Sequence, residues 1–457
     1  MTKKSNTPSY EAPKITPLDR PMTRRGPLDH RQGESPSLIA GFDPRAVLEE
    51  YGSPVVLYDA AKLKQTYADF VDAFKSRYEK MHVAYSVKTN YLSSLVALLY
   101  QEGAKMEVVS GFEYQVCRRL GIPGADITFN GPWKKNDELK EAFAQGSQVN
   151  LDNYDELLRA ERIAKEVPGK KRIGLRVNMD VSYPPWDKFG FNLASGDAIA
   201  MVRRILDNDD FELAGLHMHV GTYIPNPDQY KKGAQALVDM ALRIRDEFGV
   251  APASLDMGGG YASSNTLRGQ MLQGTATSPT PAMYAESLTE PLIKAKEKEG
   301  YEPELILEPG RALVDECGDI LTTVVSVKPL RGGGRGAIID AGVNILPTAY
   351  WYDHEISPLA TEKRPAEKVK LFGPLCMQID VVRPSVVLPA PKPGDVYAIR
   401  RVGAYNFSQS MQFIYARPNY LLAHEGQLHV IRKEETVEDA LALESVPQDL
   451  MPKGNDN

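Results

Sequence analysis

Side chains that could do chemistry stand at or near the ends of short apolar runs in this sequence. Lys88 ends the run HVAYSVK, Glu107 lies within the run KMEVVS, and Arg176 lies near the end of RIGLRVN. A lysine partly removed from water at a strand end has a lowered pKa and can form a Schiff base with an aldehyde, whereas a solvated lysine there is an ordinary surface residue. These positions predict a site that gathers an amine, a carboxylate and a guanidinium group.

Two glycine-containing motifs add groups that suit a phosphate. The motif MGGG follows a buried run, so its N–H groups could surround a phosphate, although a loose loop has the same composition; its glycines are Gly258, Gly259 and Gly260. In EPGR, Gly310 lets the backbone approach a ligand and Arg311 can grip a phosphate, while Glu308 and Arg311 could instead form a structural salt bridge. A lysine for an aldehyde, glycines and an arginine for a phosphate, and a carboxylate for a pyridine nitrogen together predict a pyridoxal phosphate site.

A pair of histidines lies beside these motifs. His217 and His219 are two residues apart in LAGLHMHVG, which places them on one face of a strand. Such a pair could suggest a metal, but no Cys, Asp or Glu stands at ligand spacing to it. We therefore expect no metal, and one of the two as a core or stacking histidine.

The apolar runs alternate with amphipathic helical stretches, as in parallel α/β proteins. Eight such runs occur within about 230 residues: HVAYSVK, KMEVVS, DITFNG, SQVNLDN, RIGLRVN, LAGLHMHVG, SLDMGGG and ELILEPG. A doubly wound sheet usually has fewer strands, so the count predicts a (β/α)8 barrel, with its active site at the carboxyl ends of the strands. The reactive residues stand at those ends.

After Gly318 the pattern changes to strands joined by turns. GDILTTVVSVKPL, GAIIDAGV, KVKLFGPLC, GDVYAIRRVG and the hairpin PNYLLAHEG–QLHVIRKEE predict a C-terminal antiparallel β domain, with GGGRG at 332–336 as a hairpin turn. PVVLYD, which precedes the barrel, is the expected partner strand from the other end of the chain. The expected organisation is a flexible tail (1–37), a segment joining the β domain (38–58), the barrel (59–318), the β domain (319–446) and a second flexible tail (447–457).

Composition limits the class of protein. The chain has 457 residues, of which 42% are hydrophobic, and a formal net charge of −6, so we expect no electrostatic grip on nucleic acid. No run approaches the roughly 20 apolar residues of a membrane helix, and the polar N-terminus lacks a signal-peptide core. The three cysteines are far apart, which argues against a disulfide framework. These features predict a cytoplasmic protein.

The motifs YSVKTN, EVVSGFE, HMHVGT, MGGG, EPGR, GPLC and GAY occur in the order found in one family. Over about residues 40–430 the chain resembles the barrel-type pyridoxal-phosphate decarboxylases, the group that holds diaminopimelate and ornithine decarboxylase, with alanine racemase a more distant relative. The resemblance implies a decarboxylase of an α-amino acid that works as a homodimer with shared active sites.

The resemblance also implies roles for single residues. Lys88 matches the Schiff-base lysine, His219 the histidine stacked on the cofactor ring, and Glu308 the carboxylate paired with the pyridine nitrogen, supported by Arg176. The residues that match the phosphate site are Thr222 (where the family usually has serine), Gly258, Gly259, Gly260, Gly310, Arg311 and Tyr405. Cys376 in GPLC matches a cysteine that enters the active site from the second subunit, and either Cys376 or Lys88 returns a proton to the substrate carbon.

The chain departs from the family where the distal part of a substrate would bind. Diaminopimelate decarboxylases resemble CESGD after the cysteine, whereas this chain has CMQID, so Met377 replaces an acid while Asp380 still matches the later aspartate. Those enzymes usually also carry an arginine in the stretch where this chain has Pro347 and Thr348. Glu107 stands where an aspartate is usual, which should alter the geometry only slightly.

These departures lead to a hypothesis about the substrate. Without the acid and the arginine, we expect a specialised decarboxylase of an amino acid group on a larger or differently charged small molecule, or on a carrier. Three aromatic residues, Tyr350, Trp351 and Tyr352, would suit a roomier distal pocket, or else pack a dimer interface. The alternatives are a true meso-diaminopimelate decarboxylase that makes L-lysine, a racemase, and a non-catalytic pyridoxal-phosphate-binding protein.

Overall fold

A computed structural model describes residues 37–181, 186–359 and 362–451. The tail expected at 1–37 therefore lies outside the described residues except for its last residue. Of the tail expected at 447–457, residues 447–451 are described and include the short turn η5 (Gln448–Leu450). Among the described residues, no helix combines the length and apolar character needed to cross a membrane.

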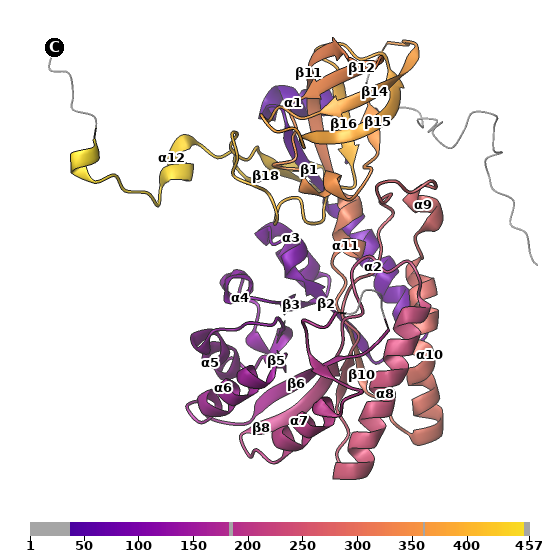
Figure 1. Cartoon of the computed structure of the whole chain (residues 1–457), viewed down its shortest axis with the longest axis vertical. Coiled ribbons are helices and arrows are strands. Elements are labelled where there is room, and N and C mark those ends of the chain that lie inside the picture. Colours follow the sequence, from indigo (N-terminus) through magenta and orange to yellow (C-terminus); the bar gives the residue numbers. More distant parts are fainter. Residues whose placement is uncertain (1–36, 182–185, 360–361, 452–457) are drawn as a thin grey trace, which may run out of the picture.

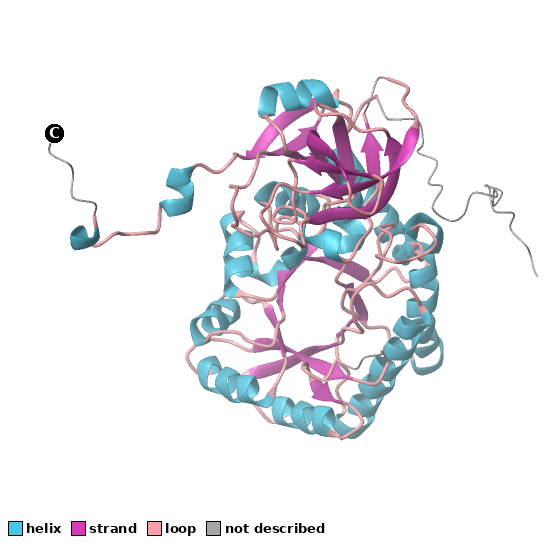
Figure 2. Cartoon of the chain, turned by 45° about the horizontal axis from the view of Figure 1, so that its top comes forward, coloured by secondary structure: helices cyan, strands magenta, loops and turns pink. Residues whose placement is uncertain are grey.

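Eight parallel strands form a closed barrel, as the sequence predicts (Figure 2). Their order around the sheet follows the chain, and pairing of the fourth strand with the fifth closes the ring. The strands are β2 (Met81–Ser86), β3 (Lys105–Val108), β4 (Ile127–Phe129), β5 (Gln148–Leu151), β6 (Lys171–Asn178), β8 (Phe211–His217), β9 (Ser254–Asp256) and β10 (Glu304–Leu307), with a two-residue strand β7 (Phe191–Asn192) beside β6.

Helices cover the outside of the barrel (Figure 1). Those that follow barrel strands are α3 (Ser93–Gln101), α4 (Gly111–Arg119), α5 (Asn136–Ala144), α6 (Tyr154–Ala164), α7 (Asp197–Leu206), α8 (Asp228–Phe248), the short α9 (Gly274–Thr277), α10 (Pro281–Glu299) and the single turn α11 (Arg311–Val314). The last turn is too short to cover its strand. Instead α2 (Ala60–Lys75), which precedes the first barrel strand, packs against both α10 and α3 and completes the ring.

Capping residues fix where several of these helices begin. The side chains of Ser110, Asn153 and Thr280 accept hydrogen bonds from backbone N–H groups of the first turns of α4, α6 and α10. For α4 and α6 the capped helix begins three residues after the strand end, whereas α10 begins 25 residues after the end of β9. The connections after β3 and β5 are therefore short.

The second domain is a mixed sheet, which corrects the expectation of an antiparallel one. Most neighbours are antiparallel, but β1 pairs with β17 and β12 with β14 in parallel. The strands of this domain are β1 (Val55–Asp59), β11 (Gly318–Pro329), β12 (Arg335–Ile339), β13 (Ile356–Pro358), β14 (Ala366–Phe372), β15 (Val381–Pro389), β16 (Val396–Arg400), β17 (Tyr420–His424) and β18 (Gln427–Arg432).

Both ends of the chain complete this domain. Strand β1, from the PVVLYD segment, lies between β11 and β17, and the helix α1 (Pro44–Tyr51) precedes it. The PVVLYD segment therefore lies inside the sheet of the β domain. After β18 the chain extends away from the domain and forms the short helix α12 (Val437–Leu441), followed by the 3₁₀ turn η5 (Figure 1).

Candidate active site

A cavity of about 310 Å³ opens at the carboxyl ends of the barrel strands, where a (β/α)8 barrel places its active site. The predicted site residues that line it are Lys88, Glu107, Arg176, His219, Thr222, Gly259, Gly260, Glu308, Gly310, Arg311 and Tyr405. The topology thus brings together residues that are as many as 317 positions apart, from Lys88 to Tyr405. Gly258 lies directly behind this lining, with its N–H donating to Asp256 Oδ1 at 2.9 Å.

Lys88 lies one residue beyond the strand, in the 3₁₀ turn η1 (Val87–Thr89) that follows β2. Its Nζ donates to Glu107 Oε2 at 2.9 Å, and the lysine side chain is 35% exposed. Burial acts to lower the pKa of Lys88, but the negative charges of Glu107 and Glu308 outweigh it, so the pKa is raised. The expectation of a lowered lysine pKa is therefore wrong, because a carboxylate stands directly beside the amine.

Glu308 lies at the base of the cavity among three polar side chains. Asn130 Nδ2 donates to Glu308 Oε1 at 2.5 Å, and His217 Nε2 lies 3.5 Å from Glu308 Oε2. Asp256 is close enough to His217 and Glu308 that one ligand-type atom of each lies within 4.8 Å of the others. The sequence spacing did not reveal that two acids join His217.

The two neighbouring acids differ in their protonation. Burial and the negative charge of Glu308 raise the pKa of Asp256 well above its ordinary value. Burial also acts to raise the pKa of Glu308, but His217 and Lys88 outweigh it and leave that pKa below its ordinary value. Since like charges in one buried site cannot both ionise, the proton resides on Asp256 and Glu308 stays a carboxylate.

His219 lines the cavity with its ring fixed on both sides. Its Nδ1 accepts a hydrogen bond from Gly259 N at 3.1 Å, and the ring lies 5.2 Å from that of Trp186. Burial, together with the positive charges of Arg176 and Lys88, lowers the pKa of His219 to about 3. The ring is therefore neutral near pH 7, which suits stacking on a heterocycle better than binding an anion.

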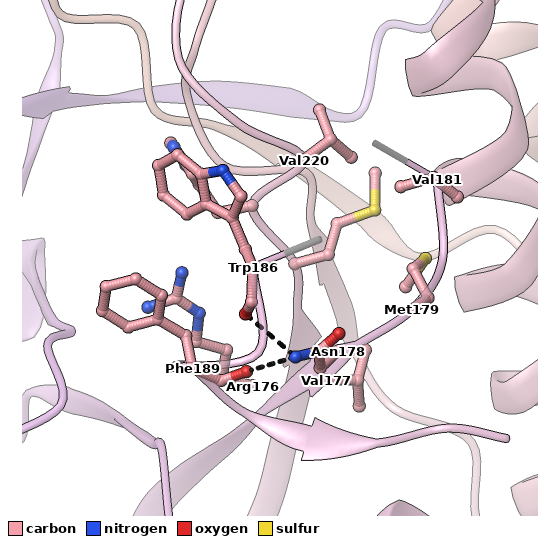
Figure 3. Close-up of a pocket in the computed structure, with 10 residues that line it drawn as sticks. Arg176, Val177, Asn178, Met179, Val181, Trp186, Phe189 and Val220 are labelled. Carbon is pink, nitrogen blue, oxygen red and sulfur yellow. Dashed lines mark hydrogen bonds between the residues drawn. The ribbon is translucent and has the colours of Figure 1, made fainter. Parts of the chain in front are cut away.

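Arg176 lies between an acid and an aromatic ring. Its Nη1 is 3.3 Å from Asp152 Oδ1, and its guanidinium lies 4.3 Å from the centre of the Phe189 ring. Figure 3 shows the neighbouring Asn178, whose Nδ2 donates to the backbone oxygens of Trp186 and Phe189 at 3.0 Å each. This bonding holds the segment that carries both aromatic rings against the barrel rim.

The glycine motifs and Arg311 lie together at one end of the cavity. Gly260 has φ +100°, and a Cβ there would lie 2.2 Å from the backbone oxygen of Gly221, so this turn admits only glycine. Arg311 Nη1 pairs with Asp315 Oδ2 at 3.0 Å, and its guanidinium lies 4.7 and 5.0 Å from the rings of Tyr352 and Tyr405. The alternative of a Glu308–Arg311 salt bridge is wrong, because Asp315 takes that place.

The residues assigned to the distal part of the substrate lie outside the cavity of their own chain. Asp380 accepts hydrogen bonds from Val343 N at 2.9 Å and Leu375 N at 2.7 Å, so its two oxygens join the loop that carries Cys376 and Met377 to the segment after β12. Cys376 is exposed on that loop. Among the described residues that line the cavity, none comes from this loop.

The three aromatic residues expected near the substrate separate from one another. Tyr350 and Trp351 are exposed at the surface, at 64% and 50%. Tyr352 is buried and its ring packs on that of Tyr223, which lines the cavity. The aromatic stretch therefore contributes one ring behind the Arg311 end and two rings to the surface.

Asn130 and Trp186 line the cavity but were not predicted from sequence, and Asp256 lies below it. Asn130 follows β4 directly, so the general expectation that strand ends carry the site could have found it. Trp186 lies in the irregular connection after β6 and gives no comparable signal.

The residues present fit pyridoxal phosphate. One cavity holds an amine that can meet an aldehyde, a carboxylate kept ionised in a buried setting, a neutral imidazole, and a guanidinium beside glycine turns. Neither ring nitrogen of His217 forms a hydrogen bond among the described residues, so this buried imidazole can still bond a polar group of a ligand. The fold and the site together define a barrel-type pyridoxal-phosphate-dependent enzyme.

Comparison with known proteins agrees with this class and gives the family. The family described as "Pyridoxal-dependent decarboxylase, pyridoxal binding domain" matches residues 61–315. Diaminopimelate decarboxylase of Methanothermobacter thermautotrophicus is 30% identical over 430 residues, which cover 91% of this chain and 97% of the relative. The Bacillus subtilis diaminopimelate decarboxylase is 28% identical, covering 89% and 94%. The chain belongs to the pyridoxal-dependent decarboxylases, and its cofactor is pyridoxal phosphate.

A solved structure shows the same architecture. Diaminopimelate decarboxylase of Methanocaldococcus jannaschii, crystallised with L-lysine, superposes with a TM-score of 0.85 at 27% sequence identity. The superposition covers 93% of this chain and all of the relative. The barrel and the β domain are thus both shared with an enzyme of this family.

Proposed function

We propose that this decarboxylase acts on an α-amino acid group whose distal part differs from that of meso-diaminopimelate. The observation that carries the proposal is the position of Thr348, which stands in the stretch where related enzymes usually carry an arginine. Thr348 is 1% exposed, lies 2.8 Å from His354 Nε2, and donates to Asn406 Oδ1 at 2.7 Å. A side chain bonded in this way cannot reach a substrate, and Met377 offers no charge to a distal amine.

The second candidate is a true meso-diaminopimelate decarboxylase. The curated relatives carry that name, and a relative of the same fold was crystallised with L-lysine. Arg268 also lies next to the altered stretch: its backbone N–H donates to Trp351 O at 2.8 Å, and its side chain is one-third exposed. Arg268 therefore places a positive charge next to the stretch where the distal carboxylate of meso-diaminopimelate would bind.

The first measurement is turnover of meso-diaminopimelate by the cofactor-loaded protein, following CO2 and lysine together. We expect kcat/KM at least about 10²-fold below that of the Bacillus subtilis relative assayed alongside, because each missing charged contact is worth roughly 1.5–3 kcal/mol. Met377→Glu, which restores an acid, should raise this value. Lysine formed at the relative's rate would refute the proposal and establish the second candidate.

The cofactor, when bound, supplies a ring that absorbs the electron pair left behind by CO2. In our proposal Lys88 Nζ holds the aldehyde end, and Glu308 holds a proton at the ring nitrogen. His219 orients the ring from one face, while Arg311, Thr222, Tyr405 and the glycine turns hold the phosphate. Glu107 accepts a hydrogen bond from Lys88 Nζ and holds that nitrogen in place, and Lys88 Nζ or Cys376 Sγ would return a proton to the substrate carbon.

We further propose that the active form is a homodimer in which Cys376 of each chain serves the site of the other. Its support is that Cys376 is exposed and that its loop does not line the cavity of its own chain. Exposed apolar side chains such as Phe112, Phe413 and Ile414 would be covered by a second copy.

Mixing two inactive variants tests this arrangement. Lys88→Ala should be nearly inactive alone because it lacks the cofactor's amine, and Cys376→Ala because, with Cys376 serving the partner's site, it lacks a proton-transfer group worth roughly 10²–10⁴-fold in rate. Unfolded and refolded together, they should recover about a quarter of the wild-type activity, because half of the random dimers are mixed and hold one intact site of two. No recovery in a mixture that sedimentation shows to be dimeric would contradict shared sites.

A further inference from the structure

Asn130 occupies a position that connects the two carboxylates of the site. It lies immediately after β4, at the carboxyl end of the barrel, and is 3% exposed. Its Nδ2 donates to Glu107 Oε1 at 3.1 Å and to Glu308 Oε1 at 2.5 Å. An amide nitrogen carries two hydrogens, so one side chain can serve both acids at once.

A second asparagine fixes the orientation of this amide. Asn130 Oδ1 accepts a hydrogen bond from Asn150 Nδ2 at 2.8 Å, and Asn150 Oδ1 accepts one from Gln148 Nε2 at 3.1 Å. The reverse orientation of the Asn130 amide would direct its oxygen at two carboxylates and leave Asn150 Nδ2 facing a donor. The network therefore permits only the orientation in which both hydrogens point to the acids.

Apart from Asn130, Glu107 and Glu308 contact different polar groups. Glu107 receives hydrogen bonds from Lys88 Nζ at 2.9 Å and from Ser86 Oγ at 2.5 Å. Glu308 lies beside His217, with Asp256 nearby. A donor that cannot lose its proton, placed between two carboxylates, stabilises the charged form of both and keeps them from sharing a proton.

We propose that Asn130 is a positioning residue that keeps Glu107 directed at Lys88 and Glu308 directed at the cofactor's ring nitrogen. This inference rests on the proposed roles of Lys88 and Glu308. Asn130 itself holds no proton in the reaction. It acts through its hydrogen bonds to Glu107 and Glu308.

The test is a pH titration of the absorption of the cofactor bound to the full-length protein, without substrate. Without Asn130, Glu107 becomes a stronger base beside the nitrogen of Lys88, and Glu308 takes up a proton more readily, which withdraws positive charge from the ring. Both changes favour a proton on the nitrogen that joins Lys88 to the cofactor. Asn130→Leu should therefore raise the midpoint of the colour change by about one pH unit.

Two further variants separate positioning from packing. Asn150→Ala leaves the Asn130 amide in place but removes its orienting bond, so it should move the midpoint in the same direction by less. Asn153 is the N-cap of α6, and its side chain donates to Pro132 O but contacts neither acid. Asn153→Ala should therefore leave the midpoint unchanged. An unmoved midpoint in Asn130→Leu would overturn the proposal, even if its thermal stability fell.

The outcome remains decisive if Asn130→Leu does not fold. Asn130→Asp preserves the size of the side chain and leaves at most one donor for the two acids, so it must raise the midpoint as well. An unchanged midpoint in Asn130→Asp would overturn the proposal. Failure of the proposed site is distinguishable, because Lys88→Ala would then show the same cofactor titration as the wild type.

Discussion

Lys88→Ala is expected to abolish the absorption band of cofactor joined to the protein and to reduce decarboxylation by at least about 10³-fold. The reason is that Lys88 Nζ is the amine directed into the cavity between Glu107 and the glycine turns. The variant loses both the attachment of the cofactor and a proton-transfer group, and proton transfer alone is worth roughly 10²–10⁴-fold. Absorption spectroscopy of the reconstituted protein, with CO2 release from its substrate, measures both effects.

A second lysine in the same cavity provides a matched control. Lys188 also lines the cavity, but its Nζ lies 5.2 Å from the Phe189 ring, on the rim segment after β6. Lys188→Ala should keep the absorption band. If Lys88→Ala keeps the band while Lys188→Ala loses it, the assignment of the two lysines is reversed.

The barrel could be predicted from the sequence because its strands are buried on both faces. Runs such as QVNL in β5 are fully buried, and eight of them alternating with capped helices leave few other architectures. The mixed pairing of the second domain could not be predicted in the same way. The parallel contact of β1 with β17 joins segments more than 360 residues apart, and nothing local in either strand encodes its direction.

Two strands of the β domain, β13 and β15, escaped the sequence pattern, and β15 did so for a local reason. Strand β15 contains Pro384, which interrupts a strand pattern because it lacks an N–H group. The structure tolerates it where the register between β14 and β15 shifts. A proline at such an irregularity removes no regular ladder bond.

The candidate site was predictable where strand ends carry reactive residues, and unpredictable where strands meet across the barrel. Lys88, Glu308 and Arg311 have sequence motifs of their own. Asn130 stands at a strand end, but its contacts with Glu107 and Glu308, like the contact of Asp256 with Glu308, arise only when the barrel closes. The raised pKa of Lys88 has the same origin, since sequence suggests burial but does not show the direction of the Glu107 carboxylate.

Glu308→Gln is expected to lower kcat by roughly 10²–10⁴-fold while leaving cofactor affinity within about tenfold. Glutamine nearly preserves the shape of Glu308 but carries no charge, so it cannot hold a proton at the ring nitrogen as the electron pair arrives. The phosphate end, at Arg311, is built from other residues and keeps its contacts. Stopped-flow turnover and equilibrium binding of the cofactor distinguish these two quantities.

The pH dependence sharpens the same experiment. The pKa of Glu308 lies below its ordinary value, so the wild-type carboxylate stays charged throughout the neutral range, and its ionisation contributes no pH step to kcat there. The loss in Glu308→Gln should therefore be nearly the same at pH 6 and pH 8. Glu304→Gln is the matched control: Glu304 begins the same strand, β10, and bonds His82 at the opposite end of the barrel. Glu304→Gln should keep kcat, and a Glu308→Gln enzyme that kept more than half of the wild-type kcat would remove Glu308 from the proposed chemistry.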